Sequence, residues 1–255
     1  MKHAGTIDAA PKRKRNPVPD TPSKSAVRKA GSTVRKAHRN EPVTTEQLQH
    51  AHTIIEQYRA AHQLPLNRIS ASLRQLVANE QIPAAVSQRI KRFPTIIDKL
   101  TRGGQSGVDD LSRMTDIGGC RIVTETRTDL YKLQQRLLEL WGPDTHSPNK
   151  ITKIRDYIAR PKDTGYRAIH LQVERDGLKF EVQLRDPRLH AWAETVEAFS
   201  GDLGVNYKQG GHSVVQELMK LLSEFDALDE AGRKPSQDQL DTMHRLYSEV
   251  QGLYP

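Results

Sequence analysis

The chain has 255 residues, of which 36% are hydrophobic and only 5% aromatic, and its formal net charge is +8. The length allows one large domain or two small ones, and the single cysteine excludes an internal disulfide and a cysteine-rich zinc site. No apolar run approaches the roughly 18 residues of a membrane span, and no signal-peptide core is present, so we expect a cytoplasmic protein without a membrane partner.

The positive charge is concentrated in residues 1–40. This segment holds eleven Lys and Arg against two Asp, whereas the rest of the chain carries 28 basic and 29 acidic side chains. It lacks aromatic residues and has few aliphatic ones, so it cannot bury enough surface to offset the entropy lost on ordering. We therefore predict a disordered basic tail over 1–41 and a folded body over 42–255. Such a tail can contact tRNA or the ribosome, or can be only a solvated leader.

Helical and strand patterns alternate along the body, and helices accumulate at its end. Thr44 or Thr45 caps an amphipathic helix that reaches His62, and Pro94 opens a shorter helix that ends at Gly103. The further elements are a helix at 67–79, a strand-like run at 117–124, a helix at 128–141, a strand at 151–158, a hairpin, and helices at 187–200, 212–231 and 236–252. The pattern predicts an α/β (α+β) fold, a mixed β-sheet flanked by helices with helical extensions at both ends. These extensions can also join copies of the chain into a homo-oligomer.

The hairpin HLQVERDGLKFEVQLR gives the most specific structural prediction. Its Asp176-Gly177 dipeptide suits a two-residue type I′ turn, because both central residues of that turn need a positive φ. The turn fixes the register, so Gln172 faces Glu181 and one side of the hairpin is apolar. The other side carries Tyr166, His170, Gln172, Glu181, Gln183 and Arg185. An aromatic ring, a carboxylate, amides and an Arg together suit a nucleotide. An antiparallel sheet with one solvent-exposed face shows the same alternation of polar and apolar residues without any site.

Asp116 precedes the strand-like run and can supply a second carboxylate. Paired with Glu181, it can hold a hard cation such as Mg²⁺. In a regular strand Asp116 and Arg121 have opposite parity, so both serve one site only if Asp116 lies outside the strand or Gly118-Gly119 forms a bulge. The alternative is that Asp116 is only a turn residue and Gly118-Gly119 only a bulge near the start of the strand. Cys120, between the glycines and an apolar run, is predicted to be a buried small residue rather than a reactive thiol.

The segment upstream of Asp116 supplies cations. Thr95 and Lys99 share one face of the predicted short helix, and Arg89 and Lys91 precede it. Such a cluster can hold a triphosphate, although a charged, solvated helix face has the same pattern.

Together and in this order, these segments resemble the synthetase domain of the RelA/SpoT family of alarmone synthetases, particularly its short, single-domain members. The resemblance runs from about Arg89 to Lys208. It is carried by Arg89-x-Lys91 with Thr95 and Lys99, by Asp116-Ile-Gly-Gly-Cys-Arg121, by Asp156-Tyr-Ile with Pro161-Lys162 and Gly165-Tyr166-Arg-Ala-Ile-His170, and by Glu181-Val-Gln183-Leu-Arg185. The sequence has no His-Asp dipeptide, so we expect no hydrolase domain of the kind found in the long family members.

The resemblance implies a nucleotidyltransferase-like fold and transfer of pyrophosphate from ATP to the 3′-hydroxyl of GDP or GTP, which makes the guanosine tetra- or pentaphosphate of the stringent response. It implies that Asp116 and Glu181 are catalytic and hold Mg²⁺, and an alternative role of Glu181 is to accept the proton of the 3′-hydroxyl. The implied ATP-binding residues are Arg89, Lys91, Thr95, Lys99 and Arg121. The implied acceptor-binding residues are Lys162, Tyr166, His170, Gln183 and Arg185.

Three departures from the family pattern bear on the acceptor more than on the chemistry. Thr164 replaces the usual Asn before Gly-Tyr, and Ala198 replaces the His expected after Glu197. The spacing of Pro and the hydroxyl residue in Arg92-Phe-Pro-Thr95 also differs from the commoner Ser-Pro-x-Ser. One alternative is therefore a toxin-type synthetase, with an antitoxin partner, that pyrophosphorylates the 3′ end of tRNA or an adenine nucleotide. A near-neutral body argues against tRNA, which needs several cationic contacts. The other alternative, an inactive nucleotide- or RNA-binding module, is disfavoured because both carboxylates and the cations are present.

Overall fold

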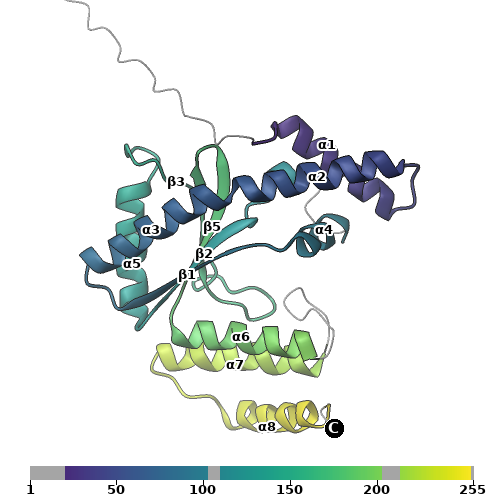
Figure 1. Cartoon of the computed structure of the whole chain (residues 1–255). Coiled ribbons are helices and arrows are strands. Elements are labelled where there is room, and N and C mark those ends of the chain that lie inside the picture. The colour runs from purple at the N-terminus through teal and green to yellow at the C-terminus, as the bar shows by residue number, and fades with distance from the viewer. Residues whose placement is uncertain (1–20, 103–109, 203–212, 254–255) are drawn as a thin grey trace, which may run out of the picture.

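Five strands form one mixed β-sheet in the order β1-β2-β5-β4-β3, with helices packed around it (Figure 1). The structure is a computed structural model that describes residues 21–102, 110–202 and 213–253. Its helices are α1 (Lys24–His38), α2 (Thr45–Ala61), α3 (Gln63–Asn79), α4 (Phe93–Thr101), α5 (Arg127–Trp141), α6 (Pro187–Asp202), α7 (Val214–Glu230) and α8 (Gln237–Gln251), with one 3₁₀ turn, η1 (Leu111–Arg113). Its strands are β1 (Ala84–Ile90), β2 (Gly118–Thr124), β3 (Lys150–Asp156), β4 (Ile169–Arg175) and β5 (Leu178–Arg185).

Strand directions confirm the predicted mixed sheet. β2 and β5 run parallel, whereas the pairs β1–β2, β5–β4 and β4–β3 are antiparallel.

None of the helices in the described ranges has the length and apolar character that crossing a membrane requires.

The β4–β5 hairpin has the predicted turn and register. Asp176 and Gly177 have φ values of 52° and 81°, and Gln172 pairs with Glu181. The apolar side chains of one face are all fully buried, namely Ile169, Leu171, Val173, Phe180, Val182 and Leu184. The polar side chains therefore share the opposite face, as the turn chemistry predicts.

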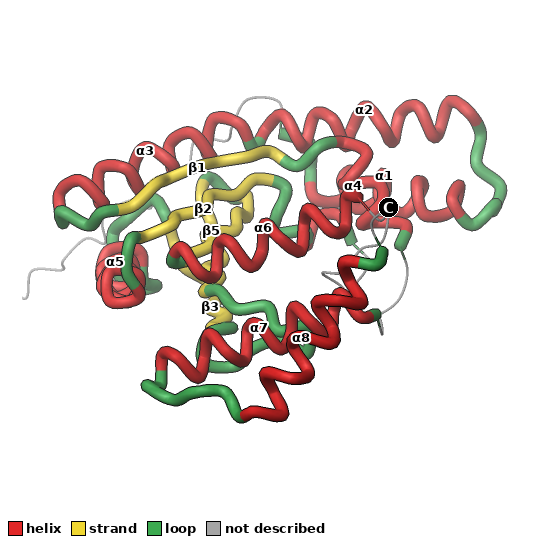
Figure 2. The backbone as a smooth tube through the Cα atoms, turned by 90° about the horizontal axis from the view of Figure 1, so that it is seen from below, coloured by secondary structure: helices red, strands yellow, loops and turns green. Residues whose placement is uncertain are grey.

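Helices α3 and α5 pack on the apolar face of the sheet. Leu73 of α3 and Leu133 of α5 lie in one buried cluster with Phe180 of β5. Figure 2 shows α2 and α3 following one another along one side of the sheet, and α7 lying beside α8. The helix α6 faces the polar side instead, because its Trp192 lines the same hollow as Glu181.

The structure corrects the prediction of a disordered tail over 1–41 in the part of that range that it describes, from residue 21 onward. Residues 24–38 form α1, which Ser23 caps by accepting a hydrogen bond from the amide of Ala26. Val27, Ala30 and Val34 are 0–4% exposed against the body. The basic side chains occupy the outer surface of an amphipathic helix, which is why composition alone suggested a solvated segment. Residues 1–20 lie outside the described part of the chain.

Strand β1 was not predicted from the sequence. It is an edge strand in which half-buried and exposed residues alternate, so it lacks the strong apolar alternation of a central strand. The other predicted elements of the body are present with ends shifted by a few residues. The expected helix end at Gly103, the start of the helix at 212 and the motif end at Lys208 fall outside the described residues.

Candidate active site

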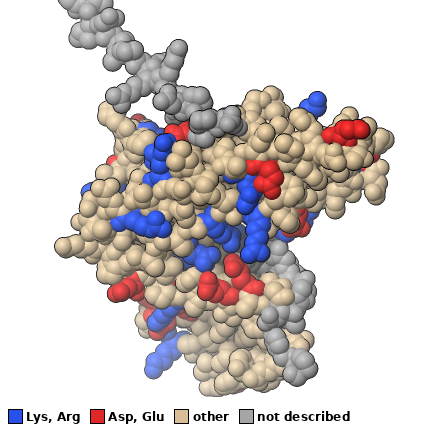
Figure 3. All heavy atoms as spheres, viewed as in Figure 1, with Lys and Arg blue, Asp and Glu red and all other residues tan. Residues whose placement is uncertain are grey.

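Two adjoining hollows on the polar face of the sheet form one cleft. Their volumes are about 380 and about 290 Å³. They share Arg89, Asp116, Arg121, Glu181, Gln183 and Glu197. On this side of the molecule, Lys and Arg side chains gather between the sheet and α6, with acidic side chains beside them (Figure 3). The cleft therefore combines a cationic surface with the two carboxylates singled out in the sequence.

Most of the predicted site residues line the cleft. These are Arg89, Lys99, Asp116, Arg121, Lys162, Tyr166, His170, Glu181, Gln183 and Arg185. Lys91 reaches the site through an ion pair with Asp116. Thr95 is exposed on α4 and is not among the residues that line either hollow, so the structure does not bring it to the others.

Asp116 lies outside the regular strand. β2 begins at Gly118, and its registers with β1 and β5 run without a shift, so no bulge is needed to place Asp116 and Arg121 in one cleft. Cys120 is buried, which raises the pKa of its thiol to about 12. This confirms the predicted burial of Cys120.

Two lysines hold one oxygen of Asp116. Oδ2 lies 3.0 Å from Nζ of Lys91 and 2.8 Å from Nζ of Lys99. Burial by itself would raise the pKa of the Asp116 carboxyl, but the charges and hydrogen bonds of the two lysines lower it below its ordinary value. The other oxygen, Oδ1, is buried and has no hydrogen-bond partner within the described ranges. Asp116 is thus an ionised carboxylate whose Oδ1 can accept a further contact.

Glu181 is held on the same face by side chains of the hairpin. His170 Nδ1 lies 3.0 Å from Oε1, and Gln183 Nε2 donates to Oε2 over 2.7 Å. Burial would raise the pKa of Glu181, but the His170 contact, the Gln183 hydrogen bond and the charge of Lys99 lower it to about 2. Glu181 is therefore ionised throughout the neutral range.

A hydrogen-bonded chain connects Glu181 to the aromatic end of the cleft. A carboxylate only accepts, so His170 donates from Nδ1, and in a neutral ring Nε2 accepts from the Tyr166 hydroxyl at 2.7 Å. Arg185 donates to the same hydroxyl and to Gln183 Oε1, over 3.1 and 3.0 Å. The hairpin thereby fixes the position of Tyr166, which itself lies before β4.

Aromatic rings and a lysine form the end of the cleft next to Tyr166. The Lys162 ammonium lies 4.8 Å from the ring centroid of Tyr157 and 5.1 Å from that of Tyr166. Burial lowers the pKa of Lys162 and raises that of Tyr166. Stacking surface and a cation are thus presented together, which suits a nucleobase attached to phosphate.

Arg89 and Arg121 lie at the opposite end, near β1. Arg89 pairs with Gly119 in the β1–β2 register, and the guanidinium of Arg121 lies 3.2 Å from Glu194 of α6. Burial and then the neighbouring Arg185 lower the pKa of Arg121.

No role was predicted for Arg155, Tyr157, Trp192 or Glu197, which also line the cleft. Tyr157 lies in the Asp156-Tyr-Ile motif, so the sequence already indicated that its ring belongs to a region shared with the family. Arg155 pairs with His170 across β3 and β4, and this register was not predicted. Trp192 and Glu197 reach the cleft from α6 through tertiary packing. The sequence carried a signal only for Glu197, as the residue that precedes the expected His of the family pattern.

The donor set fits Mg²⁺. Two carboxylates from different elements line one cleft, and Oδ1 of Asp116 is an acceptor without a partner in the described ranges. Those ranges contain no group of three or more His, Cys, Asp or Glu that could hold a metal ion. Mg²⁺ commonly takes only one or two protein carboxylates and completes its shell with water and substrate phosphates.

Comparison with known proteins places this cleft inside a recognised family region. The family described as "Region found in RelA / SpoT proteins" matches residues 88–212. GTP pyrophosphokinase YwaC of Bacillus subtilis is 31% identical over 115 residues, which cover 41% of this chain and 52% of that protein. The chain spans about half or less of the length of the curated relatives that it matches first.

Two solved structures share the fold. Small alarmone synthetase 2 from Bacillus subtilis aligns with a TM-score of 0.53 and 24% identity, over 65% of this chain and 90% of that one. Small alarmone synthetase 1 from Bacillus subtilis, bound to its product pppGpp, aligns with a TM-score of 0.50 and 24% identity, over 72% and 92%.

Proposed function

The chain belongs to the RelA/SpoT family, and from this membership we propose that it is an ATP-dependent pyrophosphokinase acting on GDP or GTP. The observation that carries the proposal is that Glu181 and Asp116, which is held by Lys91 and Lys99, line one cleft with two arginines at one end and aromatic rings at the other. Such an arrangement suits two nucleotides that meet at a charged centre. The name of YwaC as a GTP pyrophosphokinase and the pppGpp bound to small alarmone synthetase 1 support the same choice of acceptor.

In this proposal the 3′-hydroxyl oxygen of GDP or GTP attacks the β-phosphorus of ATP. The bond from that phosphorus to the oxygen bridging to the α-phosphate breaks, AMP leaves, and the hydroxyl proton passes to water. Lys91 and Lys99 exchange their contact with Asp116 for the ATP phosphates, and Arg89 and Arg121 hold the adenine. Positioning and charge neutralisation contribute most of the rate in reactions of this type.

Asp116 and Glu181 are the residues that would hold Mg²⁺, and the ion would supply positive charge beside the transferring phosphates. The low pKa of Glu181, about 2, favours this role over acceptance of the hydroxyl proton, because so weak a base takes up a proton poorly near neutral pH. His170 orients the Glu181 carboxylate through the contact from Nδ1.

At the acceptor end, Tyr166 would stack on guanine and Lys162 would contact the acceptor phosphates. Gln183 and Arg185 act by fixing Glu181 and Tyr166 through their hydrogen bonds. The Oγ1 atom of Thr164 lines this end, is buried, and has no partner in the described ranges. This hydroxyl is therefore available to an acceptor even though the usual Asn is absent.

The proposal is tested by supplying γ-labelled ATP with GDP, GTP, ADP or deacylated tRNA in separate reactions. We expect label on GDP and GTP. Label only on tRNA or ADP would replace the proposed acceptor by that of a toxin-type synthetase. Absence of label on every acceptor would favour a nucleotide-binding module and contradict the proposal. The Glu181→Gln variant, which keeps shape but removes charge, is the matched negative control.

A further inference from the structure

The loop that carries the proposed acceptor contacts is attached to the C-terminal helices. It connects β3 to β4 and includes Lys162, Thr164 and Tyr166, all of which line the cleft. Within the loop, the amide of Lys162 donates a hydrogen bond to the carbonyl of Tyr166 over 3.2 Å. The amide of Gly165 donates to the carbonyl of Lys162 over 2.8 Å. The loop is therefore a closed turn.

Gly165 is in direct contact with α7. Ser223 donates from Oγ to the Gly165 carbonyl over 2.6 Å, in a buried hydrogen bond. Gly165 has φ +82°, and a Cβ added there would lie 2.9 Å from the Cα of Lys220. The loop backbone and the helix backbone thus approach more closely than any residue with a side chain allows.

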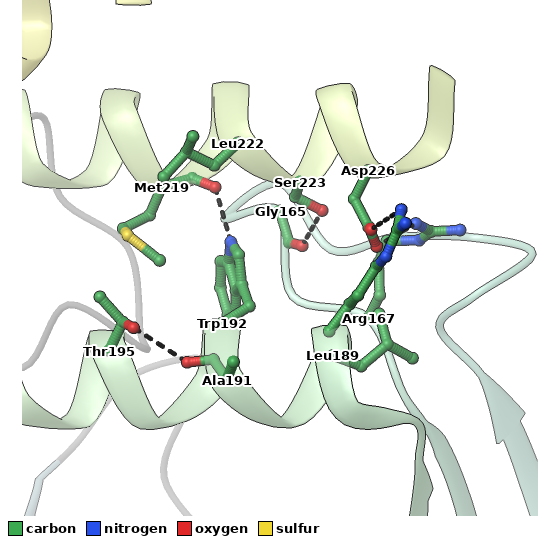
Figure 4. A pocket seen from close by; sticks show the side chains of 11 residues that line it. Gly165, Arg167, Leu189, Ala191, Trp192, Thr195, Met219, Leu222, Ser223 and Asp226 are labelled. Atoms are coloured by element: carbon green, nitrogen blue, oxygen red, sulfur yellow. Dashed lines mark hydrogen bonds and ion pairs between the residues drawn. The ribbon is translucent and has the colours of Figure 1, made fainter. Parts of the chain in front are cut away.

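The two residues after Gly165 are attached to the same helices. Arg167, only 5% exposed, donates to Asp226 over 3.3 Å and to Glu230 over 3.1 and 2.7 Å. Trp192 of α6 lies edge-on to the Tyr166 ring with centroids 6.0 Å apart, and its Nε1 donates to the Met219 carbonyl of α7 over 2.6 Å. Figure 4 shows three of the contacts between the loop, α6 and α7: Ser223 with Gly165, Trp192 with Met219, and Arg167 with Asp226.

Trp192 also separates the cleft from a second hollow. This hollow has a volume of about 250 Å³ and lies between α6 and α7. Its lining includes Leu189, Met219 and Leu222 as well as Trp192 (Figure 4). Because space remains beside the indole, packing alone does not fix the ring, and the hydrogen bond from Nε1 to Met219 limits its movement.

We infer that Ser223 and Trp192 are positioning residues for the acceptor nucleotide. Through them, α7 holds the loop so that Tyr166 presents its ring, and Lys162 its ammonium group, to the cleft. This inference rests on the proposed function, since it assigns the acceptor end of that site. It predicts a defect in acceptor binding, whereas a purely structural role predicts a loss of stability that affects both nucleotides equally.

The test compares steady-state transfer from ATP to GDP in Ser223→Ala and Trp192→Phe with the unmodified protein. Each variant removes one hydrogen bond, and Trp192→Phe keeps an aromatic ring. Ser248→Ala is the matched control, because the Ser248 hydroxyl is exposed and bonds only within α8, to His244. We expect the KM for GDP to rise roughly three- to tenfold in both variants, with an unchanged KM for ATP and no change in the control.

A fluorescence titration with GDP in the absence of ATP gives a second measurement. The chain has two tryptophans, and the other, Trp141, is buried in the main core. We expect GDP to change the emission of the unmodified protein but not that of Trp192→Phe, and to bind Ser223→Ala more weakly.

The outcomes distinguish the proposed pyrophosphokinase function from the positioning role of Ser223 and Trp192. An unmodified protein that transfers nothing to a guanine nucleotide would overturn the proposed function, and the titration would then still decide the inference. Equal KM values for GDP in an active unmodified protein and both variants, or an equal rise of both KM values, would overturn the inference. A GDP response that survives in Trp192→Phe would also contradict it.

Discussion

His170 Nδ1 lies 3.0 Å from Oε1 of Glu181, on the face of the hairpin that the Asp176-Gly177 turn directs into the cleft. This contact orients the Glu181 carboxylate and lowers its pKa, so it favours the ionised form. It also connects the charged centre with Tyr166, which contacts the other ring nitrogen of His170. The charged centre and the proposed acceptor end of the cleft therefore share one hydrogen-bonded chain.

The first prediction concerns stability in acid. Burial opposes ionisation of Glu181, yet its contacts lower its pKa from 4.5 to about 2. A carboxyl with a lowered pKa in the folded state stabilises the fold above its unfolded pKa, and this contribution is lost as pH falls from about 4.5 to about 2. In urea unfolding, the advantage of the unmodified protein over Glu181→Gln should therefore shrink across this window. An advantage that stays constant from neutral pH down to about pH 2.5 would contradict the assigned ionisation.

The second prediction separates donor from acceptor. Lys99→Ala removes a cation from Asp116 and from the proposed triphosphate site, so kcat should fall by about 10²–10³ with every acceptor. Tyr166→Ala should mainly weaken acceptor binding, by about 1–3 kcal/mol for a lost stacking contact. Steady-state kinetics with varied ATP and varied GDP distinguish the two effects. Lys132→Ala, at an exposed position on α5, is the matched lysine control.

A Lys99→Ala variant that raised only the KM for GDP would contradict the assignment of Lys99 to the donor. A Tyr166→Ala variant that raised only the KM for ATP would contradict the assignment of Tyr166 to the acceptor.

The third prediction concerns the N-terminus. Deletion of residues 1–39 removes α1, exposes the surface against which Val27 and Val34 pack, and breaks the ion pair of Arg28 with Asp110, 3.1 Å long. We expect a loss of about 2–5 kcal/mol of stability, by analogy with the removal of large core side chains. Thermal unfolding measures this loss. Transfer activity should fall as well, because α1 packs against α4, which carries Lys99.

Deletion of residues 1–20 is the control for this truncation. That segment supplies none of the recognised motifs and few apolar side chains, so its removal should leave the melting temperature unchanged. Equal melting temperatures for both truncations would show that α1 contributes nothing to the fold.

The fourth prediction uses two glycines with nearly the same backbone angle. Gly165 and Gly177 have φ values of 82° and 81°, but a Cβ would meet Lys220 and Ser223 at Gly165 and nothing within 4 Å at Gly177. Gly177→Ala should cost about 1–2 kcal/mol for the left-handed conformation alone. Gly165→Ala should cost more and should also raise the KM for GDP. If both variants lost the same free energy of unfolding in urea, close packing of α7 against the loop at Gly165 would be contradicted.

Turn and cap chemistry made part of the fold predictable from the sequence. The Asp176-Gly177 turn determined the hairpin register and both of its faces. Thr44 forms a capping box with Gln47, so the start of α2 was also encoded within a few residues. In both cases the interaction is local, and the residues that make it are close in sequence.

Elements that depend on distant partners were not predictable in this way. The buried face of α1 consists of Val27, Ala30, Gly31 and Val34, a set too small to stand out among eleven basic residues without knowledge of α2. β1 becomes a strand because β2 pairs with it. Trp192 reaches the cleft only when α6 folds back over the sheet. Resemblance to a family pointed to most of the residues that line the cleft, whereas the attachment of the β3–β4 loop to α7 required the structure.

The most direct test of the central claim follows both ends of ATP in one reaction with GDP. ATP carries distinguishable labels on its α- and γ-phosphates, and the products are separated after a single incubation. Transfer of pyrophosphate predicts that the γ label appears on the guanosine product while the α label is recovered as AMP, in equal amounts. Recovery of the α label as ADP would mean transfer of a single phosphoryl group, and would contradict the account.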